Sequence, residues 1–160
     1  MHPSPYTLRQ EHWIAQPIDE VFAFFSDAHN LEKITPPWVG FKILSMSTGK
    51  IQQGTEIRYR LRLHGFPIHW CTEILKWNPP HEFIDVQRTG PCKLWHHTHR
   101  FVAEAGGTRM VDEVQYALPF GVLGRMVHAL KVQRDVREIF DYRRQQIDAT
   151  FGTQNEPHSL

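Results

Sequence analysis

The chain has 160 residues, of which 41% are hydrophobic and 12% aromatic, a composition typical of a globular protein and far from the disordered and membrane classes. Its 18 basic and 17 acidic residues leave a formal charge of +1, so no net field would attract nucleic acid or anionic lipid. There is no signal-peptide core and no apolar run of about 18 residues, so we expect a cytoplasmic protein without stable membrane insertion, and Cys71 and Cys92 as free thiols.

The first part of the chain predicts a strand followed by two short helices. Residues 6–16 lack turn residues, which favours a strand. Over residues 17–27 the apolar positions recur at helical spacing, and a second short helix is predicted over 29–35. Pro36 and Pro37 end this helix, because proline restricts the residue before it and removes backbone donors.

Six further strands are predicted, divided by turn signals. The alternation is clearest in residues 56–63, where apolar side chains at odd positions and charged side chains at even positions predict one buried and one wet face. The predicted strands are 39–47, 55–65, 66–77, 82–90, 93–104 and 108–119.

The period becomes helical again over residues 121–151, which predicts one long amphipathic helix. We expect residues 1–152 to form a single domain and 153–160 a flexible tail. The apolar stripe of the helix comprises Leu123, Met126, Val127, Leu130, Val136, Phe140, Ile147 and Phe151. Its basic residues, among them Arg134, Arg137, Arg143 and Arg144, are predicted to form a solvated face.

The order of elements predicts an α+β fold with a seven-stranded antiparallel sheet and segregated helices. Such a sheet twists and curls, and a long helix across its concave side would cover the apolar face. One helix, about 10 Å wide, cannot fill that concavity. We therefore expect a cavity between the sheet and the final helix, and a cavity is the first place to look for function.

The stretch "LWHHTHRF", residues 94–101, predicts a strand that carries imidazoles into this cavity. Side chains alternate along a strand, so Trp95, His97 and His99 share the face that Phe101 draws inward. Asp112 on the next strand and Asp85 on the preceding one are candidate partners of the histidines. A β-bulge would shift the register by one residue and bring His96 inward instead.

Three interpretations of His97 and His99 remain open. They form a buried hydrogen-bond network, or they contact a ligand and exchange protons with it, or they bind a metal. The H-x-H spacing places two imidazoles on one face, as zinc sites require, but a third ligand would have to come from Asp85 or Asp112. For Asp112 the structural alternative is a partner of a histidine or of a backbone amide.

The chain resembles the START and Bet v 1-like superfamily, also labelled SRPBCC or polyketide cyclase/dehydrase-like proteins, and in particular a bacterial subgroup of it. The resemblance covers residues 5–151 and is carried by "PIDEVFAFFSDAHNLEKITPPW", "WCTEILKWNPPHEFIDVQRTGPCKLWHHTHRF", "GGTRMVDEVQYALPFGVLG" and the arginine-rich final helix. It implies the helix-grip fold, in which a curved sheet surrounds a long C-terminal helix. It does not specify a chemistry, since the superfamily includes lipid transfer, hormone binding, polyketide cyclisation, quinone binding and chaperone regulation.

Our leading hypothesis is a protein that binds a small hydrophobic, aromatic or acyl molecule in the cavity, without a cofactor or resident metal, as a monomer or weak homodimer. The alternatives are a cyclase or dehydratase-like enzyme that uses His97, His99 and Asp112, and an interaction module that uses the outer face of the sheet. The candidate ligand-binding residues are Tyr59, Trp70, Thr72, Asp85, Gln87, Trp95, Tyr116, Met126 and Leu130.

Overall fold

A computed structural model of the chain describes residues 5–127 and 131–152. Strand β1 (Tyr6–Ile14) is followed by helices α1 (Ile18–Phe25) and α2 (Ala28–Lys33) and by the 3-10 turn η1 (Pro37–Val39). The remaining strands are β2 (Lys42–Met46), β3 (Glu56–Leu63), β4 (Phe66–Asn78), β5 (Glu82–Thr89), β6 (Leu94–Glu104) and β7 (Gly107–Ala117). Two helices follow in the described residues, α3 (Gly121–Val127) and α4 (Gln133–Phe151).

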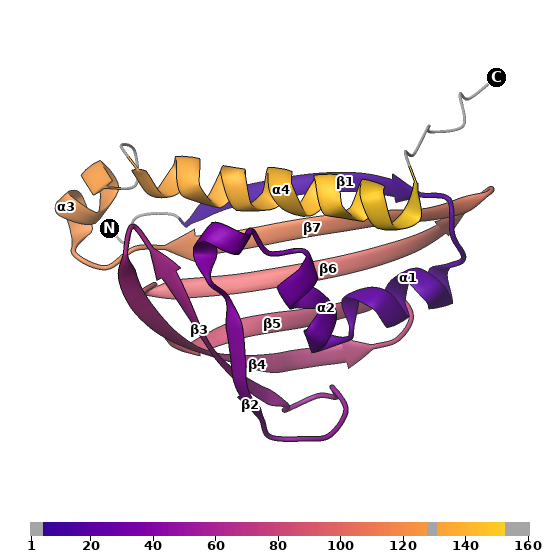
Figure 1. Cartoon of the computed structure of the whole chain (residues 1–160), viewed down its shortest axis with the longest axis horizontal. Helices are drawn as coiled ribbons and strands as arrows, with labels where there is room; N and C mark the ends of the chain where they lie inside the picture. The colour runs from indigo at the N-terminus through magenta and orange to yellow at the C-terminus, as the bar shows by residue number, and fades with distance from the viewer. Residues whose placement is uncertain (1–4, 128–130, 153–160) are drawn as a thin grey trace.

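The strands form one seven-stranded antiparallel sheet in the order β1-β7-β6-β5-β4-β3-β2. The first strand therefore lies beside the last, and the other neighbours follow the chain. Figure 1 shows the sheet curving, with α4 running along β1 and β7. The predicted α+β helix-grip architecture is confirmed. No helix of the described residues is long and apolar enough to cross a membrane.

The helix predicted over 121–151 is found in the described residues as two helices on either side of residues 128–130, which the structure does not describe. The chain forms α3, then α4 from Gln133, with residues 131–132 in a π-helical turn before it. The apolar side chains Leu123, Met126 and Val127 of α3 are exposed, at 61%, 57% and 44%. Helical periodicity shows only which side chains lie on the same face of a helix. It does not show how far the surface that could cover this face extends.

Local chemistry explains where several elements begin and turn. Helix α2 begins after Asp27, whose side chain accepts a hydrogen bond from the backbone N–H of His29 over 2.9 Å. The β6–β7 hairpin turns through Gly106, which has a φ of +80°, a conformation that favours glycine. This hairpin sets the β6–β7 register, and so sets which residues of these two strands lie opposite each other.

Two groups of buried side chains pack on the inner face of the sheet. One joins Ile147 of α4 and Phe22 of α1 to Phe83 and Phe101 on β5 and β6. The other joins Phe140 of α4 to Val114 and Tyr116 on β7. Helix α4 is thus anchored at two positions seven residues apart, both on the face that meets the sheet. A cavity occupies the space between α4 and the remaining strands.

Candidate functional site

A cavity of about 380 Å³ lies between the sheet and α4. Helices α1 and α2, strands β3 to β7 and α4 all contribute to its wall, which is mostly apolar. The volume falls within the roughly 300–1,000 Å³ of small-molecule sites. Polar side chains interrupt the apolar wall at a few positions, chiefly Asp85, His97, His99 and Arg143, together with Tyr59 and Thr72.

Strand β6 carries the histidines into this wall in the predicted register. It pairs with β5 and β7 without a register shift, so the strict alternation of side chains is preserved. His97 and His99 are buried, at 5% and 7% exposure, and Phe101 follows them on the same face. The alternative register that would bring His96 inward is therefore wrong.

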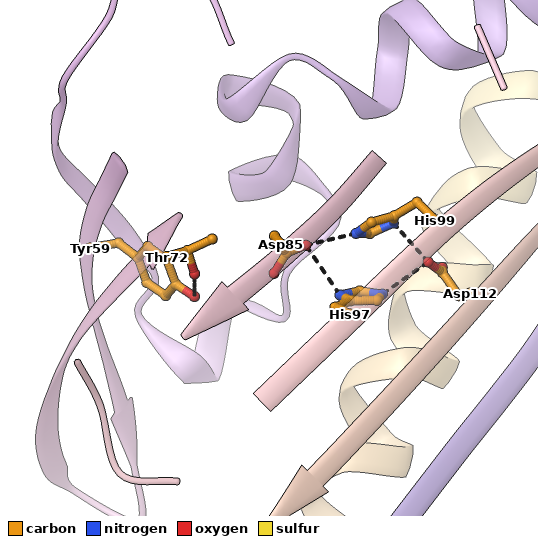
Figure 2. A network of polar contacts seen from close by, with 6 residues as sticks. All are labelled: Tyr59, Thr72, Asp85, His97, His99 and Asp112. Atoms are coloured by element: carbon orange, nitrogen blue, oxygen red, sulfur yellow. Dashed lines mark hydrogen bonds and ion pairs between the residues drawn. The ribbon is translucent and has the colours of Figure 1, made fainter. Parts of the chain in front are cut away.

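Asp85 and Asp112 hold the two imidazoles between them, as Figure 2 shows. On the cavity side, His99 Nε2 donates to Asp85 Oδ2 over 2.9 Å, and His97 Nδ1 lies 3.7 Å from the same oxygen. On the other side, His97 Nε2 donates to Asp112 Oδ1 over 3.0 Å, and His99 Nδ1 lies 2.8 Å from that oxygen. The His99 Nδ1 contact is close but not aligned as a hydrogen bond. Each carboxylate thus contacts both imidazoles through one oxygen.

Cross-strand pairing produces this arrangement. His99 lies opposite Asp112 on β7, and His97 lies opposite Asp85 on β5. Residues opposite each other in an antiparallel pair are close enough for their side chains to interact. The two other contacts are diagonal, because each aspartate also reaches the histidine two residues away on the same face.

The electrostatics of the four groups depend on burial and on mutual attraction. Burial alone would raise the pKa of Asp112, but the charge of His99 and the hydrogen bond from His97 hold this pKa well below its usual range. Burial also opposes ionisation of Asp85, yet His97 and His99 lower its pKa. Both carboxyl groups are therefore ionised at neutral pH.

The two imidazoles differ in their protonation. Burial, followed by the charge of His99, lowers the pKa of His97 against the attraction of the two carboxylates. For His99 burial acts in the same direction, but the charge of Asp112 and the hydrogen bond to Asp85 outweigh it and raise the pKa. The protein therefore favours a neutral His97 beside a more readily protonated His99.

Aromatic side chains fix the positions of the imidazoles and continue the wall. The His97 and His99 ring centroids are 3.7 Å apart, and Phe83 stacks on His99 at 4.1 Å with an interplanar angle of 18°. Trp70 meets Trp95 edge to face at 5.2 Å. Such packing restricts side-chain rotation and gives a ligand rigid, flat surfaces.

A second polar pair lies farther along the wall. The Tyr59 hydroxyl and the Thr72 hydroxyl are 3.2 Å apart and form a hydrogen bond across β3 and β4 (Figure 2). Burial raises the pKa of Tyr59, so its hydroxyl stays protonated. The pair offers a neutral hydroxyl group to a ligand, in contrast to the charged groups around His99.

Most of the predicted ligand-binding residues meet in the cavity wall, two do not, and one lies outside the described residues. Gln87 is occupied elsewhere, because its side-chain amide donates to the Cys92 carbonyl over 2.6 Å and accepts from the Cys92 N–H over 3.2 Å. Met126 lies on α3, is exposed and does not line the cavity. Leu130 lies outside the described residues. The wall includes Tyr59, Trp70, Thr72, Asp85, Trp95, Tyr116, His97 and His99.

Arg143 was missed as a site residue, because the charge pattern of its helix predicted a solvated face. Arg143 lines the cavity, and its guanidinium carbon lies 4.9 Å from the centre of the Phe140 ring. Its Nε is buried without a hydrogen-bond partner among the described residues. The signal was present in the sequence, because Arg143 lies three residues after Phe140 and four before Ile147, both of which face the sheet.

The site therefore combines an apolar cavity with a compact set of acid, base and cationic groups. It can orient a ligand oxygen by hydrogen bonds, because His99 and Arg143 are donors and Asp85 is an acceptor. It can also hold a proton or exchange one with a ligand. Asp85, His97 and His99 each offer one potential metal-ligating atom, and these three atoms lie within 4.8 Å of one another.

Comparison with known proteins places the chain among others of this architecture. The sequence profile of the family described as "Polyketide cyclase / dehydrase and lipid transport" matches residues 14–140. A protein from Thermus thermophilus is similar over 91% of this chain and 99% of its own, with 21% identity and a TM-score of 0.63. The ginseng major latex-like protein 151 from Panax ginseng is similar over 94% and 99%, with 11% identity and a TM-score of 0.65. No curated protein matches the sequence significantly.

Proposed function

Since the chain belongs to the polyketide cyclase/dehydrase and lipid transport family of the START/Bet v 1-like superfamily, we propose that it binds a small hydrophobic molecule, aromatic or acyl, in the cavity between the sheet and α4. The observation that carries this proposal is the cavity of about 380 Å³ with its largely apolar wall. Apolar surface facing an open space has a free-energy cost in water, and an apolar ligand would remove that cost.

The distribution of polar groups supports an amphipathic ligand. Trp70 and Trp95 would contact its apolar body, because their rings form the rigid part of the wall. An oxygen of the ligand would meet His99 or Arg143, since the buried Nε of Arg143 lacks a partner among the described residues. A hydroxyl, carbonyl or carboxylate at one end of an otherwise apolar molecule fits this pattern.

We place this function in a reducing, cytoplasmic environment, and in a monomer or weak homodimer. The free thiols Cys71 and Cys92 support the reducing environment. The binding partner in this proposal is the small molecule, which a single chain can enclose.

The experiment that tests the proposal begins with native mass spectrometry of the freshly purified protein. A retained compound would appear as added mass and would be identified after denaturing extraction. The stripped protein would then be melted with a panel of fatty acids, quinones and polyketide-like aromatics. A true ligand raises the melting temperature with concentration, because it binds the folded state only. If no compound is retained and no member of the panel changes the melting temperature, the proposal is wrong.

A second candidate function, proton transfer on a bound carbonyl compound, is supported by the position of His97. Its Nε2 donates to Asp112, so in the neutral ring Nδ1 keeps its lone pair, and His97 lines the cavity. A neutral imidazole held in one tautomer by a buried carboxylate is suited to act as a general base. Arg143 or His99 would then stabilise the enolate oxygen.

This second candidate is tested by deuterium exchange next to the carbonyl of simple aromatic ketones, followed by NMR. The reaction predicts exchange that is lost in His97→Gln and retained in His96→Gln. His96 is the matched control, since it lies on the same strand but on the opposite face. Equal exchange rates in the two variants would exclude His97 as the base.

A further inference from the structure

We propose that Asp85, His97 and His99 bind a divalent transition metal ion, zinc in the first place, at the wall of the cavity. The site is independent of the apolar molecule proposed above, because the three side chains come from β5 and β6 and are already assembled.

The spacing of the potential ligands fits a tetrahedral ion. Zinc bonds to nitrogen and oxygen at about 2.0–2.2 Å, which separates tetrahedral ligands by roughly 3.3 Å. Asp85 Oδ2 lies 2.9 Å from His99 Nε2 and 3.7 Å from His97 Nδ1, so the two separations bracket this value. An ion would replace the proton that His99 now shares with Asp85. The three potential ligand atoms lie within 4.8 Å of one another, and an ion would draw them to about 3.3 Å apart.

Asp112 supplies the carboxylate that a histidine-based metal site usually has on the side of the imidazoles away from the metal. A ligating imidazole usually donates its second N–H to a carboxylate, which fixes the tautomer and turns the ring toward the metal. His97 Nε2 and His99 Nδ1 lie 3.0 and 2.8 Å from Asp112 Oδ1, on the side opposite Asp85 (Figure 2). Asp112 therefore holds the His97 ring by a hydrogen bond and lies in close contact with the His99 ring, while the remaining nitrogens of both rings and Asp85 lie within 4.8 Å of one another. This arrangement is the main argument for a metal.

The charges of the site also favour a divalent ion. Asp85 and Asp112 place two carboxyl groups beside the imidazoles, with side chains that are only 16% and 9% exposed, in a region where unpaired charge is costly. A dication balances both carboxylates while the two imidazoles are neutral. Calcium and magnesium fit poorly, because they prefer six or more oxygen ligands and the site offers two nitrogens and one carboxylate. Two imidazoles and one carboxylate suit zinc.

The fourth position of such an ion would face the cavity. Asp85, His97 and His99 all line its wall, and Asp112 does not. Three protein ligands with an open fourth position are typical of zinc sites that exchange water for another oxygen donor. The chemical class of ligand that this position would take is an oxygen donor, either water or an oxygen of the molecule in the cavity.

The test uses the full chain without an affinity tag, stripped with EDTA and titrated with zinc by calorimetry. We expect one zinc per chain. Asp112→Asn should weaken binding about 10–100-fold, because a carboxylate behind a ligating histidine contributes that much. Asp85→Asn and His99→Gln should weaken it further, since each removes a direct ligand. His96→Gln is the matched control and should leave the affinity unchanged. Circular dichroism checks that each variant is folded.

Cobalt provides a measurement that needs no variant. Co²⁺ bound to the wild-type chain should show the intense visible absorption of a four- or five-coordinate ion, and zinc should displace it. The proposal is overturned if the cobalt absorption is weak and typical of six-coordination, or if no zinc binds at micromolar concentration. It is also overturned if binding survives both Asp85→Asn and His99→Gln, since zinc would then be held by adventitious surface histidines. Melting the EDTA-stripped chain with the panel of fatty acids, quinones and polyketide-like aromatics tests the proposed function separately.

Discussion

Replacing Asp112 by asparagine tests how strongly the buried His/Asp cluster is coupled. Asp112 is 7% exposed, and its Oδ1 contacts His97 over 3.0 Å and His99 over 2.8 Å. Removing one partner of a buried charged pair costs about 3–5 kcal/mol. The asparagine oxygen can still accept one of the two contacts, so we expect a loss near the lower end, about 3 kcal/mol.

Urea unfolding at neutral pH, followed by tryptophan fluorescence and circular dichroism, measures this loss. The buffer contains EDTA, so that metal binding to the folded state does not contribute. In calorimetry the melting temperature should fall by about 6–12 °C, at roughly 2–4 °C for each kcal/mol in a chain of this size. Glu113→Gln is the matched control, since it makes the same change one residue away on the other face of β7. It should change stability by less than about 0.5 kcal/mol.

A double-mutant cycle with His99→Gln separates the contact from the general cost of each substitution. The Asp112–His99 coupling should lie within about 0.5–3 kcal/mol, the range for residues in one buried network. If Asp112→Asn destabilises the protein by less than about 1 kcal/mol, or if the coupling is zero, the cluster is not the tightly coupled unit described above. Either result would refute the inference that the site is preorganised.

Three further predictions concern the cavity and the core. Burial raises the pKa of the Cys92 thiol to about 11. The alkylation rate of Cys92, followed by mass spectrometry, should therefore rise about tenfold for each pH unit between about pH 7 and 9. A rate that does not change with pH would contradict the burial of this thiol. Trp70→Ala should weaken binding of a fluorescent apolar probe about tenfold or more. Trp38→Ala, which removes a ring that is 62% exposed and outside the cavity, should leave this binding unchanged. Equal effects of the two variants would mean that the probe binds outside the cavity. Phe101→Ala should reduce the free energy of unfolding, measured in urea, by about 3–5 kcal/mol, because Phe101 is 2% exposed. Val102→Ala, at a position that is 50% exposed, serves as the control, and similar losses in both variants would contradict the assigned core.

The sequence determined the order and the faces of the strands. Alternation in β6 placed His97 and His99 inward, and alternation in β7 placed Asp112 inward, because side chains on successive residues of a strand must point to opposite faces. The Gly106 turn made the two strands neighbours, so a contact of Asp112 with His97 or His99 could be predicted, and the structure pairs Asp112 with His99. Local periodicity was sufficient for these predictions, because each depends on residues close together in the chain.

Only the tertiary structure decided what meets across the cavity. The contacts of Asp85 and Asp112 with both histidines depend on the alignment of the three strands β5, β6 and β7. Arg143 enters the wall because α4 is rotated to bury Phe140, which a pattern of charged residues along one helix does not reveal.

The exposure of Met126 on α3 likewise depends on how far the surface that could cover this helix extends. Periodicity in a sequence fixes which residues share a face. Which faces then come together, and at what distance, is set by the packing of elements far apart in the chain, and this decided the geometry of the site.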